Sequence, residues 1–193
     1  MKTGITGGIG SGKSYVCRLL AERGIQVYDC DSAAKRLMRE SAELRTRLTD
    51  LIGPDTYQRG SDPQGHDCWM LNKAAVAKFL LASEQNTHAI DAIVHPAVFR
   101  DFEESGLQWM ESAILFESGI NRLVDRVIVV TAPLEVRISR IMQRDGISHE
   151  KALEWIGRQW PQEEVCRRAD FQIVNDGCAD LEQQIESIIE ISK

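Results

Sequence analysis

Paired cysteines and long hydrophobic runs are both missing from this sequence of 193 residues. The five cysteines are scattered along the chain, at Cys17, Cys30, Cys68, Cys166 and Cys178. An odd, scattered set without a Cys-x-x-Cys pair argues against a disulfide framework and a zinc site, and it fits a reducing cytosol. The longest apolar runs, such as VIVV at 127–130, are too short to span a bilayer, and the N-terminus lacks a basic-then-apolar signal region. We therefore expect a cytoplasmic protein without a membrane partner.

Positive charge is also scarce, with 23 Lys and Arg residues against 29 Asp and Glu residues and a net charge of −6. Such a chain has no overall positive field that would attract nucleic acid, so we expect no nucleic-acid partner. An anionic ligand would need cations that are concentrated locally. The length suits one domain with a sizeable insertion. We expect a monomer or a weak homo-oligomer.

Five short apolar segments with turn signals at their ends are predicted as buried parallel strands, at 2–6, 25–28, 111–116, 126–131 and 171–174. Helical patterns lie between and after them. One helix is expected to run from the glycine-rich stretch to Gly24, one to begin at Pro133, and a terminal one to be capped by Asp180. This alternation predicts an α/β fold with a five-stranded parallel sheet, right-handed crossovers and flanking helices.

Two stretches break the alternation. The first lacks a predicted strand and carries apolar residues at helical spacings, so it reads as a helical insertion with an exposed turn-rich loop at 53–67. The second follows the fourth strand and is rich in arginine. We expect a nucleotide-binding core at 1–31, 107–136 and 169–193, a helical acceptor-binding insertion at 32–106, and a lid at 137–168. Four apolar residues of the insertion are expected mostly in its core, although they could line a ligand groove: Val76, Phe79, Leu80 and Ile90.

The stretch GGIGSGKS at 7–14 fits the phosphate-loop pattern G-x-x-x-x-G-K-[ST]. Its glycines allow successive backbone N–H groups to wrap a phosphate, and the helix that follows presents its positive N-terminal end to the same anion. Lys13 would reach the β- and γ-phosphates, and the Ser14 hydroxyl would bind Mg²⁺. An apolar strand before the loop and an amphipathic helix after it favour this function over a turn that is merely tightly packed. The sequence therefore predicts a site for a nucleoside triphosphate, ATP, with Mg²⁺.

Asp29 and Asp31 directly follow the second predicted strand, where substrates approach an open α/β sheet. Two residues apart in an extended chain, their carboxylates would lie on one side. One could accept a proton from an attacking hydroxyl while the other holds metal or fixes geometry. Alternatively, Asp31 or Ser32 caps the following helix, a role that is compatible with catalysis.

Several motifs in order resemble those of the dephospho-CoA kinases, over nearly the whole chain. They are TGGIGSGKS at 6–14, YDCDSAAKRL at 28–37, IVHP at 93–96, AILFESG at 113–119, RIMQRDG at 140–146 and ADFQIVNDG at 169–177. The resemblance implies ATP-dependent phosphorylation of the ribose 3′-hydroxyl of dephospho-coenzyme A. The alternatives are another phosphate-loop kinase of a nucleotide or metabolite, or a nucleotide-dependent switch or assembly ATPase.

The resemblance also implies residue roles. Asp31 matches the proposed base, His95 a His-Pro step near the acceptor, and Asn175 a position at the adenine edge of ATP. Arg140 and Arg144, four apart on one helix face, resemble lid arginines that contact the transferring phosphates. With Lys13, these arginines and Asp31 form the expected catalytic set.

The residues alone leave other interpretations open. His95 could be a helix-interior residue beside a kink, Arg140 and Arg144 a solvated face, and Asn175 a turn residue. Glu117, expected at the end of the third strand, could be a metal-side acid or an ordinary carboxylate, and Arg137 is expected to be exposed. The expected ATP site comprises Gly8, Ile9, Gly10, Ser11, Gly12, Lys13, Ser14, Tyr15 and Asn175.

Two departures from the family pattern concern the expected site. Tyr15 replaces a threonine that is common in relatives, which leaves the Ser14 hydroxyl in place. Lys73 stands where relatives often carry arginine, so any acceptor contact there would be made by a point charge rather than a bidentate fork. The expected substrate-binding residues are Asp31, Lys73 and His95.

Overall fold

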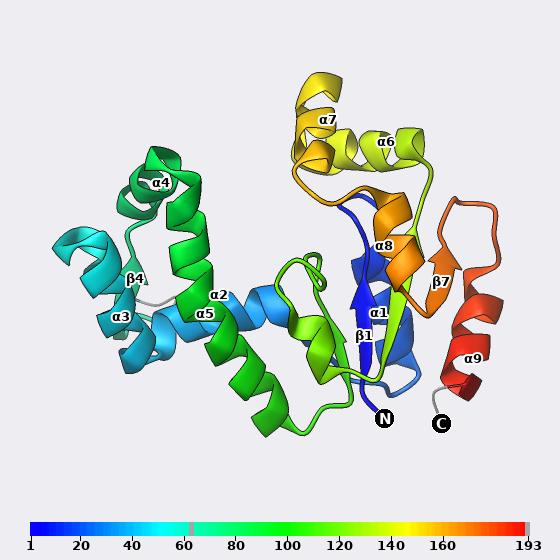
Figure 1. Ribbon diagram of the computed structural model, residues 1–193, viewed down its shortest axis with the longest axis horizontal. Coiled ribbons are helices and arrows are strands. Elements are labelled where there is room, and N and C mark those ends of the chain that lie inside the picture. Colours follow the sequence, from blue (N-terminus) through cyan, green and yellow to red (C-terminus); the bar gives the residue numbers. More distant parts are fainter. Residues whose placement is uncertain (62–63, 192–193) are drawn as a thin grey trace. The chain divides into compact units, whose positions relative to one another are not determined.

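The computed structural model describes residues 1–61 and 64–191, and the chain forms two compact units (Figure 1). One consists of Met1–Asp29 and Gly106–Lys193, and the other of Cys30–Ser105. They are called here the core unit and the helical unit, and each is described by itself. No helix within the described ranges is both long and apolar enough to cross a membrane.

The core unit contains a five-stranded sheet in the order β2-β5-β1-β6-β7, and every neighbouring pair is parallel. The strands are β1 (Thr3–Thr6), β2 (Val27–Asp29), β5 (Trp109–Glu111), β6 (Arg126–Thr131) and β7 (Phe171–Val174). The predicted α/β fold with a five-stranded parallel sheet is confirmed. The carboxyl ends of β1, β2 and β5 meet at one edge, because Glu111 is in register with both Ile5 and Asp29.

The predicted third strand was misplaced. The expected segment 111–116 contributes only Glu111 to β5, and the chain then runs through turns up to Gly119. Leu115 is nevertheless fully buried. The apolar run AILF therefore indicates a buried segment, but not an extended backbone. Short apolar runs cannot by themselves distinguish the two.

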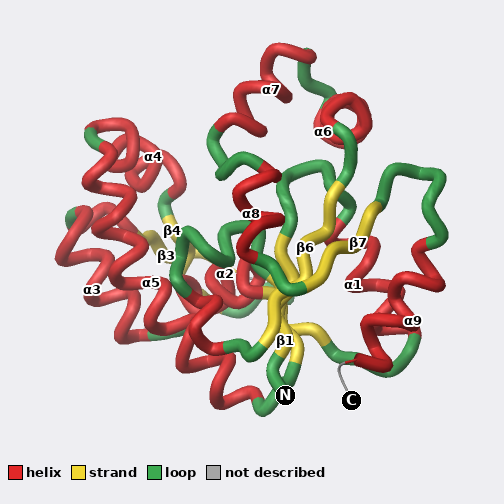
Figure 2. Tube along the Cα trace, turned by 45° about the vertical axis from the view of Figure 1, so that its right-hand side comes forward, coloured by secondary structure: helices red, strands yellow, loops and turns green. Residues whose placement is uncertain are grey.

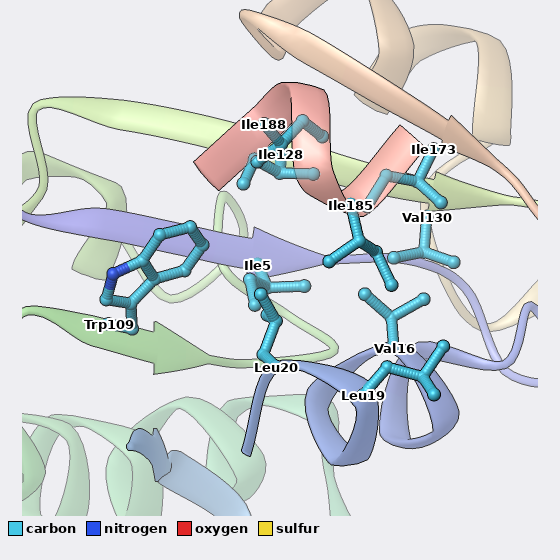
Figure 3. Close-up of a cluster of buried hydrophobic side chains, with 10 residues drawn as sticks. All are labelled: Ile5, Val16, Leu19, Leu20, Trp109, Ile128, Val130, Ile173, Ile185 and Ile188. Atoms are coloured by element: carbon cyan, nitrogen blue, oxygen red, sulfur yellow. The ribbon is translucent and has the colours of Figure 1, made fainter. Parts of the chain in front are cut away.

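Two helices cover one face of this sheet. They are α1 (Lys13–Glu22), which runs back along β1, and α9 (Leu181–Ile191), which Asp180 caps by accepting from the Gln183 amide at 3.1 Å. Figure 2 shows both on the same side of the strands, with α8 (Gln162–Arg168) on the other. Their apolar side chains meet those of the strands in one buried cluster (Figure 3). The cluster consists of Ile5, Val16, Leu19, Leu20, Trp109, Ile128, Val130, Ile173, Ile185 and Ile188.

The predicted lid region forms helices between β6 and β7. Pro133 precedes α6 (Leu134–Asp145), which ends at Gly146 in the left-handed conformation. Then follow α7 (His149–Gly157), capped by the Ser148 hydroxyl, and α8. An apolar cluster of Ile138, Ile141 and Ala152 packs α6 and α7 against each other.

The helical unit contains α2 (Cys30–Glu40), α3 (Ala42–Ile52), a 3₁₀ turn at Pro54–Thr56, α4 (Lys73–Ala82) and α5 (Glu84–Ser105). The expected absence of strands was wrong, because β3 (Tyr57–Ser61) and β4 (Asp67–Leu71) form an antiparallel hairpin that begins inside the predicted loop at 53–67 and extends beyond it. The hairpin has little apolar alternation.

Side-chain contacts hold the hairpin in place. The Tyr57 hydroxyl donates to the Met38 carbonyl at 2.7 Å, and the guanidinium of Arg59 lies 4.2 Å from the ring centre of Trp69, its cross-strand partner. Such cross-strand pairs stabilise a hairpin without a hydrophobic pattern in the sequence.

Leu44 and Leu48 of α3 are buried as their spacing predicts, but α4 buries none of its residues. Leu80 is exposed and Val76, Phe79 and Ile90 are half-buried, so the expectation that they form a core is wrong for Leu80 and only partly right for the rest.

Candidate active site

The phosphate loop connects β1 to α1, and its glycines adopt backbone conformations that other residues avoid. Gly10 and Gly12 have φ values of 80° and 89°, and Gly12 immediately precedes the helix at Lys13. Gly7 approaches a neighbouring strand so closely that an added Cβ would lie 2.5 Å from the Val130 carbonyl oxygen. The glycines are therefore required by the tight curvature and close packing of the loop.

Side chains from elsewhere in the core unit bind the carbonyl groups of this loop. The Arg137 Nε donates to the Ile9 carbonyl at 2.9 Å, and the Asn175 amide donates to the Ser11 carbonyl at 2.8 Å. One guanidinium nitrogen of Arg140 lies 3.3 Å from the same Ser11 oxygen and 3.0 Å from the Asn175 carbonyl. These bonds fix the peptide planes of the loop, as a preformed anion-binding loop requires.

Lys13 stands at the N-terminus of α1 and forms an ion pair with Glu111 at the end of β5. Both side chains are nearly buried, with 11% and 10% of their surface exposed. The predicted phosphate-binding lysine is thus held at the carboxyl edge of the sheet by a carboxylate. Ser14 and Tyr15, the next two residues of α1, are exposed.

Glu111 was not identified from the sequence, and Glu117 was expected in its place. The structure puts Glu117 in a turn six residues beyond the end of β5, where its carboxylate lies 3.5 Å from the Trp160 backbone nitrogen. The cause is the misplaced strand boundary, because the acidic residue at a strand end can be recognised only when that end is known. The residues around Glu111, MES at 110–112, form no motif that would mark this glutamate as part of a site.

The three arginines of α6 differ in burial and in their partners. Arg137, expected to be exposed, is buried with 5% of its surface accessible, and this burial lowers its pKa despite the opposing effect of Glu163. Arg140 is half-buried against the loop. Arg144 is exposed and pairs with its neighbour Asp145 at 2.7 Å. Arg140 and Arg144 both lie on α6 as expected, and their contact with the transferring phosphates stays a prediction. The spacing of four residues puts Arg140 and Arg144 on one face of the helix, but in this structure Arg140 contacts the phosphate loop and Arg144 contacts Asp145.

Asn175 follows β7 and is buried. Its amide nitrogen binds the Ser11 carbonyl, and its amide oxygen accepts from Arg140 at 3.3 Å. The next residues form a turn around Asp176, whose carboxylate accepts from the amides of Ala179 and Cys178 at 2.8 Å each, and these bonds lower its pKa. Asn175 therefore braces the loop, and its role at the adenine edge stays a prediction.

The residues predicted to contact the acceptor belong to the helical unit. Asp31 is exposed in the first turn of α2. Because β2 ends at Asp29 and α2 begins at the next residue, the two aspartates do not share an extended chain, and the argument that placed their carboxylates on one side was wrong.

Lys73 and His95 lie on the two helices that end this unit. Lys73 is the exposed first residue of α4. His95 lies within α5, next to Pro96, stacked on Phe99 at a ring separation of 6.2 Å and 3.5 Å from Asp91. The helix-interior setting expected from the sequence is confirmed for His95, and its contact with the acceptor stays a prediction.

Cys17 lies on α1 near the loop, but it is not a nucleophile. Burial raises the pKa of its thiol to about 11, more than the nearby charge of Lys13 lowers it. The thiol is therefore protonated at neutral pH, and the reactive form of cysteine is the thiolate.

Replacement of Gly12 tests whether the loop conformation is required. An alanine Cβ would overlap the Asn175 side-chain amide, in addition to the unfavourable positive φ. We expect Gly12→Ala to lower the free energy of unfolding by about 2–3 kcal/mol in urea titrations and to abolish the thermal stabilisation by ATP.

Gly24→Ala is the matched control for this substitution. Gly24 has a similar φ of 79° and no atom within 4 Å of its added Cβ. The free energy of unfolding of Gly24→Ala should fall by only about 1 kcal/mol, and this variant should still bind ATP. Equal losses in the two variants would contradict the role of the Asn175 contact.

Comparison with known proteins agrees with this geometry. The family model for dephospho-CoA kinase matches residues 1–180. A dephospho-CoA kinase from Bacteroides fragilis is 39% identical over 200 residues, which cover 98% of this chain and 91% of the relative. One from Porphyromonas gingivalis is 41% identical, with 97% and 92% covered. A crystal structure of a Thermus thermophilus protein matches with a TM-score of 0.78 and 30% identity over 100% of this chain and 95% of that one. This chain therefore belongs to the dephospho-CoA kinase family.

Proposed function

We propose that this protein transfers the γ-phosphoryl group of ATP to the ribose 3′-hydroxyl of dephospho-coenzyme A and so completes coenzyme A synthesis. The observation that carries the proposal is the phosphate loop, whose carbonyls are fixed by Arg137, Arg140 and Asn175 and which ends in Lys13. Membership of the family selects this reaction over a kinase with another acceptor and over a switch or assembly ATPase.

The cationic residues near the loop offset the charge of the triphosphate. When ATP binds, the Lys13 ammonium moves from the Glu111 carboxylate to the β- and γ-phosphate oxygens, because the triphosphate carries more negative charge than one carboxylate. Arg140 already lies beside the loop carbonyls, and Arg144 must leave Asp145 to reach a phosphate. Closure of the segment 137–168 over the nucleotide would exclude water and suppress ATP hydrolysis.

Mg²⁺ fits the oxygen groups of the core unit. The Ser14 hydroxyl at the start of α1 and the carboxylates of Asp29 and Glu111 at neighbouring strand ends are hard ligands of the type that Mg²⁺ prefers. No cluster of three or more such side chains occurs in the described ranges. Mg²⁺ is usually bound through one or two protein groups, water and substrate phosphates. When bound, the ion supplies charge neutralisation at the phosphates.

Asp31 accepts the proton of the acceptor hydroxyl and orients it. A ribose hydroxyl is a poor nucleophile, and a carboxylate aimed at it raises its reactivity. Asp31 is exposed at the N-terminus of α2, so its side chain is accessible to a substrate. Lys73 and His95 contribute to binding the same acceptor, which the helical unit holds.

We also propose that the protein acts in the cytoplasm, as a monomer or a weak homo-oligomer. None of the five cysteines, all of which lie in the described ranges, forms a disulfide bond, which fits a reducing compartment.

A direct assay tests the proposed function. The protein is incubated with ATP, Mg²⁺ and dephospho-coenzyme A, and coenzyme A is detected by mass spectrometry. We expect one coenzyme A for each ADP formed, and little ADP without the acceptor. Brisk phosphorylation of another acceptor with no coenzyme A would overturn the assignment of the substrate.

Removal of the divalent cation should stop the reaction. With excess EDTA we expect turnover to fall to background, because the phosphate charges are no longer offset, and added Mg²⁺ should restore it. Circular dichroism in EDTA should be unchanged, since no described metal cluster supports the fold. Full turnover in EDTA would contradict the need for Mg²⁺.

A further inference from the structure

The connection between α7 and α8 and the first residue of α8 form side-chain hydrogen bonds to backbone groups elsewhere in the core unit. The Gln159 side-chain oxygen accepts from the Ile9 amide at 2.7 Å. Three residues later, the Gln162 side-chain oxygen accepts from the Ala132 amide at 3.3 Å. Of these two glutamines, only Gln159 reaches the phosphate loop.

Ile9 is held from three directions. Its N–H donates to Gln159, its carbonyl accepts from Arg137 at 2.9 Å, and its side chain packs against the apolar cluster of Ile138, Ile141 and Ala152. All of these partners come from the segment 137–159. The outer half of the phosphate loop is therefore shaped by the predicted lid region.

This restraint matters because Ile9 lies between glycines. Gly8 and Gly10 give the loop a large conformational entropy that must be lost when it wraps a phosphate. A loop that is already ordered binds its ligand more tightly, because it loses less conformational entropy when the ligand binds. A neutral amide is also the suitable acceptor here, since a carboxylate would repel the triphosphate.

We propose that Gln159 is a positioning residue for ATP, which preorganises the phosphate loop through the Ile9 amide. The inference rests on the proposed function for the identity of the nucleotide. Gln159 does not take part in the chemical step, so its contribution is to ATP affinity rather than to turnover.

Gln159→Ala removes the acceptor, and Gln162→Ala, at the first residue of α8, is the matched control. We expect Gln159→Ala to raise the KM for ATP roughly 5–10-fold, the value of one lost hydrogen bond. The kcat and the KM for dephospho-coenzyme A should stay within about twofold of the wild type. In nucleotide-free protein, the Ile9 amide should exchange its hydrogen faster in Gln159→Ala and at the wild-type rate in Gln162→Ala.

Gln159→Glu provides a second variant that keeps an acceptor of the same length. The Ile9 amide should stay protected, because a carboxylate oxygen accepts the same bond. The KM for ATP should nevertheless rise, and the rise should shrink as salt screens the added charge. This variant also tests the proposal if Gln159→Ala fails to fold.

The proposal is overturned if the KM for ATP in Gln159→Ala stays within twofold of the wild type. It is equally overturned if Gln162→Ala raises this KM as much, since the effect would then be general loosening of the connection. Calorimetric titration with ATP alone gives the same comparison without an acceptor. A failure of Gln159 to affect ATP binding is thus separable from a failure of the protein to make coenzyme A.

Discussion

Asp31→Asn is expected to lower kcat by roughly 10²–10⁴-fold, the usual effect of losing a general base. The amide has the size of the carboxylate and cannot take the proton of the attacking hydroxyl. Asp31 lies in the helical unit, outside the phosphate loop, so the dissociation constant for ATP should not change. The measurement is steady-state turnover with dephospho-coenzyme A, together with calorimetric titration of ATP.

Asp50→Asn is the matched control for this prediction. Asp50 is an exposed aspartate on α3 of the same unit, and its replacement changes the net charge equally. It should leave turnover unchanged. If Asp31→Asn turns over like the wild type, the base is another group. If both variants lose activity alike, the effect is one of net charge.

Lys13→Met is expected to lower kcat by roughly 10²–10³-fold, as when one preorganised charge-stabilising group is removed from an active site. Methionine retains much of the aliphatic stem of lysine and removes the charge. The substitution also leaves Glu111 nearly buried without the Lys13 ammonium. An uncompensated buried charge should lower the free energy of unfolding by about 3 kcal/mol.

The double variant Lys13→Met with Glu111→Gln separates the two effects. The neutral amide removes the uncompensated charge, so most of the stability measured in urea titrations should return. Turnover should stay low, because the lysine that contacts the phosphates is still missing. If turnover in the double variant recovered together with the free energy of unfolding, Lys13 would affect activity only by stabilising the fold.

The phosphate loop could be predicted from the sequence because its chemistry requires a short, continuous pattern. Glycines at 7, 8, 10 and 12 are required by positive φ values or close contacts, and Lys13 must follow the last of them. The strand β6 and the helix caps at Asp180 and Gly146 were also predictable, since local apolar runs and capping residues specify them.

The hairpin of the helical unit could not be predicted in this way. Polar and apolar residues alternate only weakly along its strands β3 and β4. The hairpin is stabilised instead by contacts between residues distant in sequence, such as the hydrogen bond from the Tyr57 hydroxyl to the Met38 carbonyl. Cross-strand contacts of this kind depend on the pairing register, which single residues do not reveal.

By itself, then, the sequence determined the α/β class, the phosphate loop and the family, because each is specified by short motifs whose residues are neighbours and whose order along the chain can be read directly. Only the tertiary structure decided which side chains brace that loop. Glu111 reaches Lys13 across a strand end, Arg137 turns inward to Ile9, and Gln159 approaches the same residue from 150 positions away. The physical reason is that buried backbone amides and charges must find partners wherever the fold places them, and those partners follow no period in the sequence.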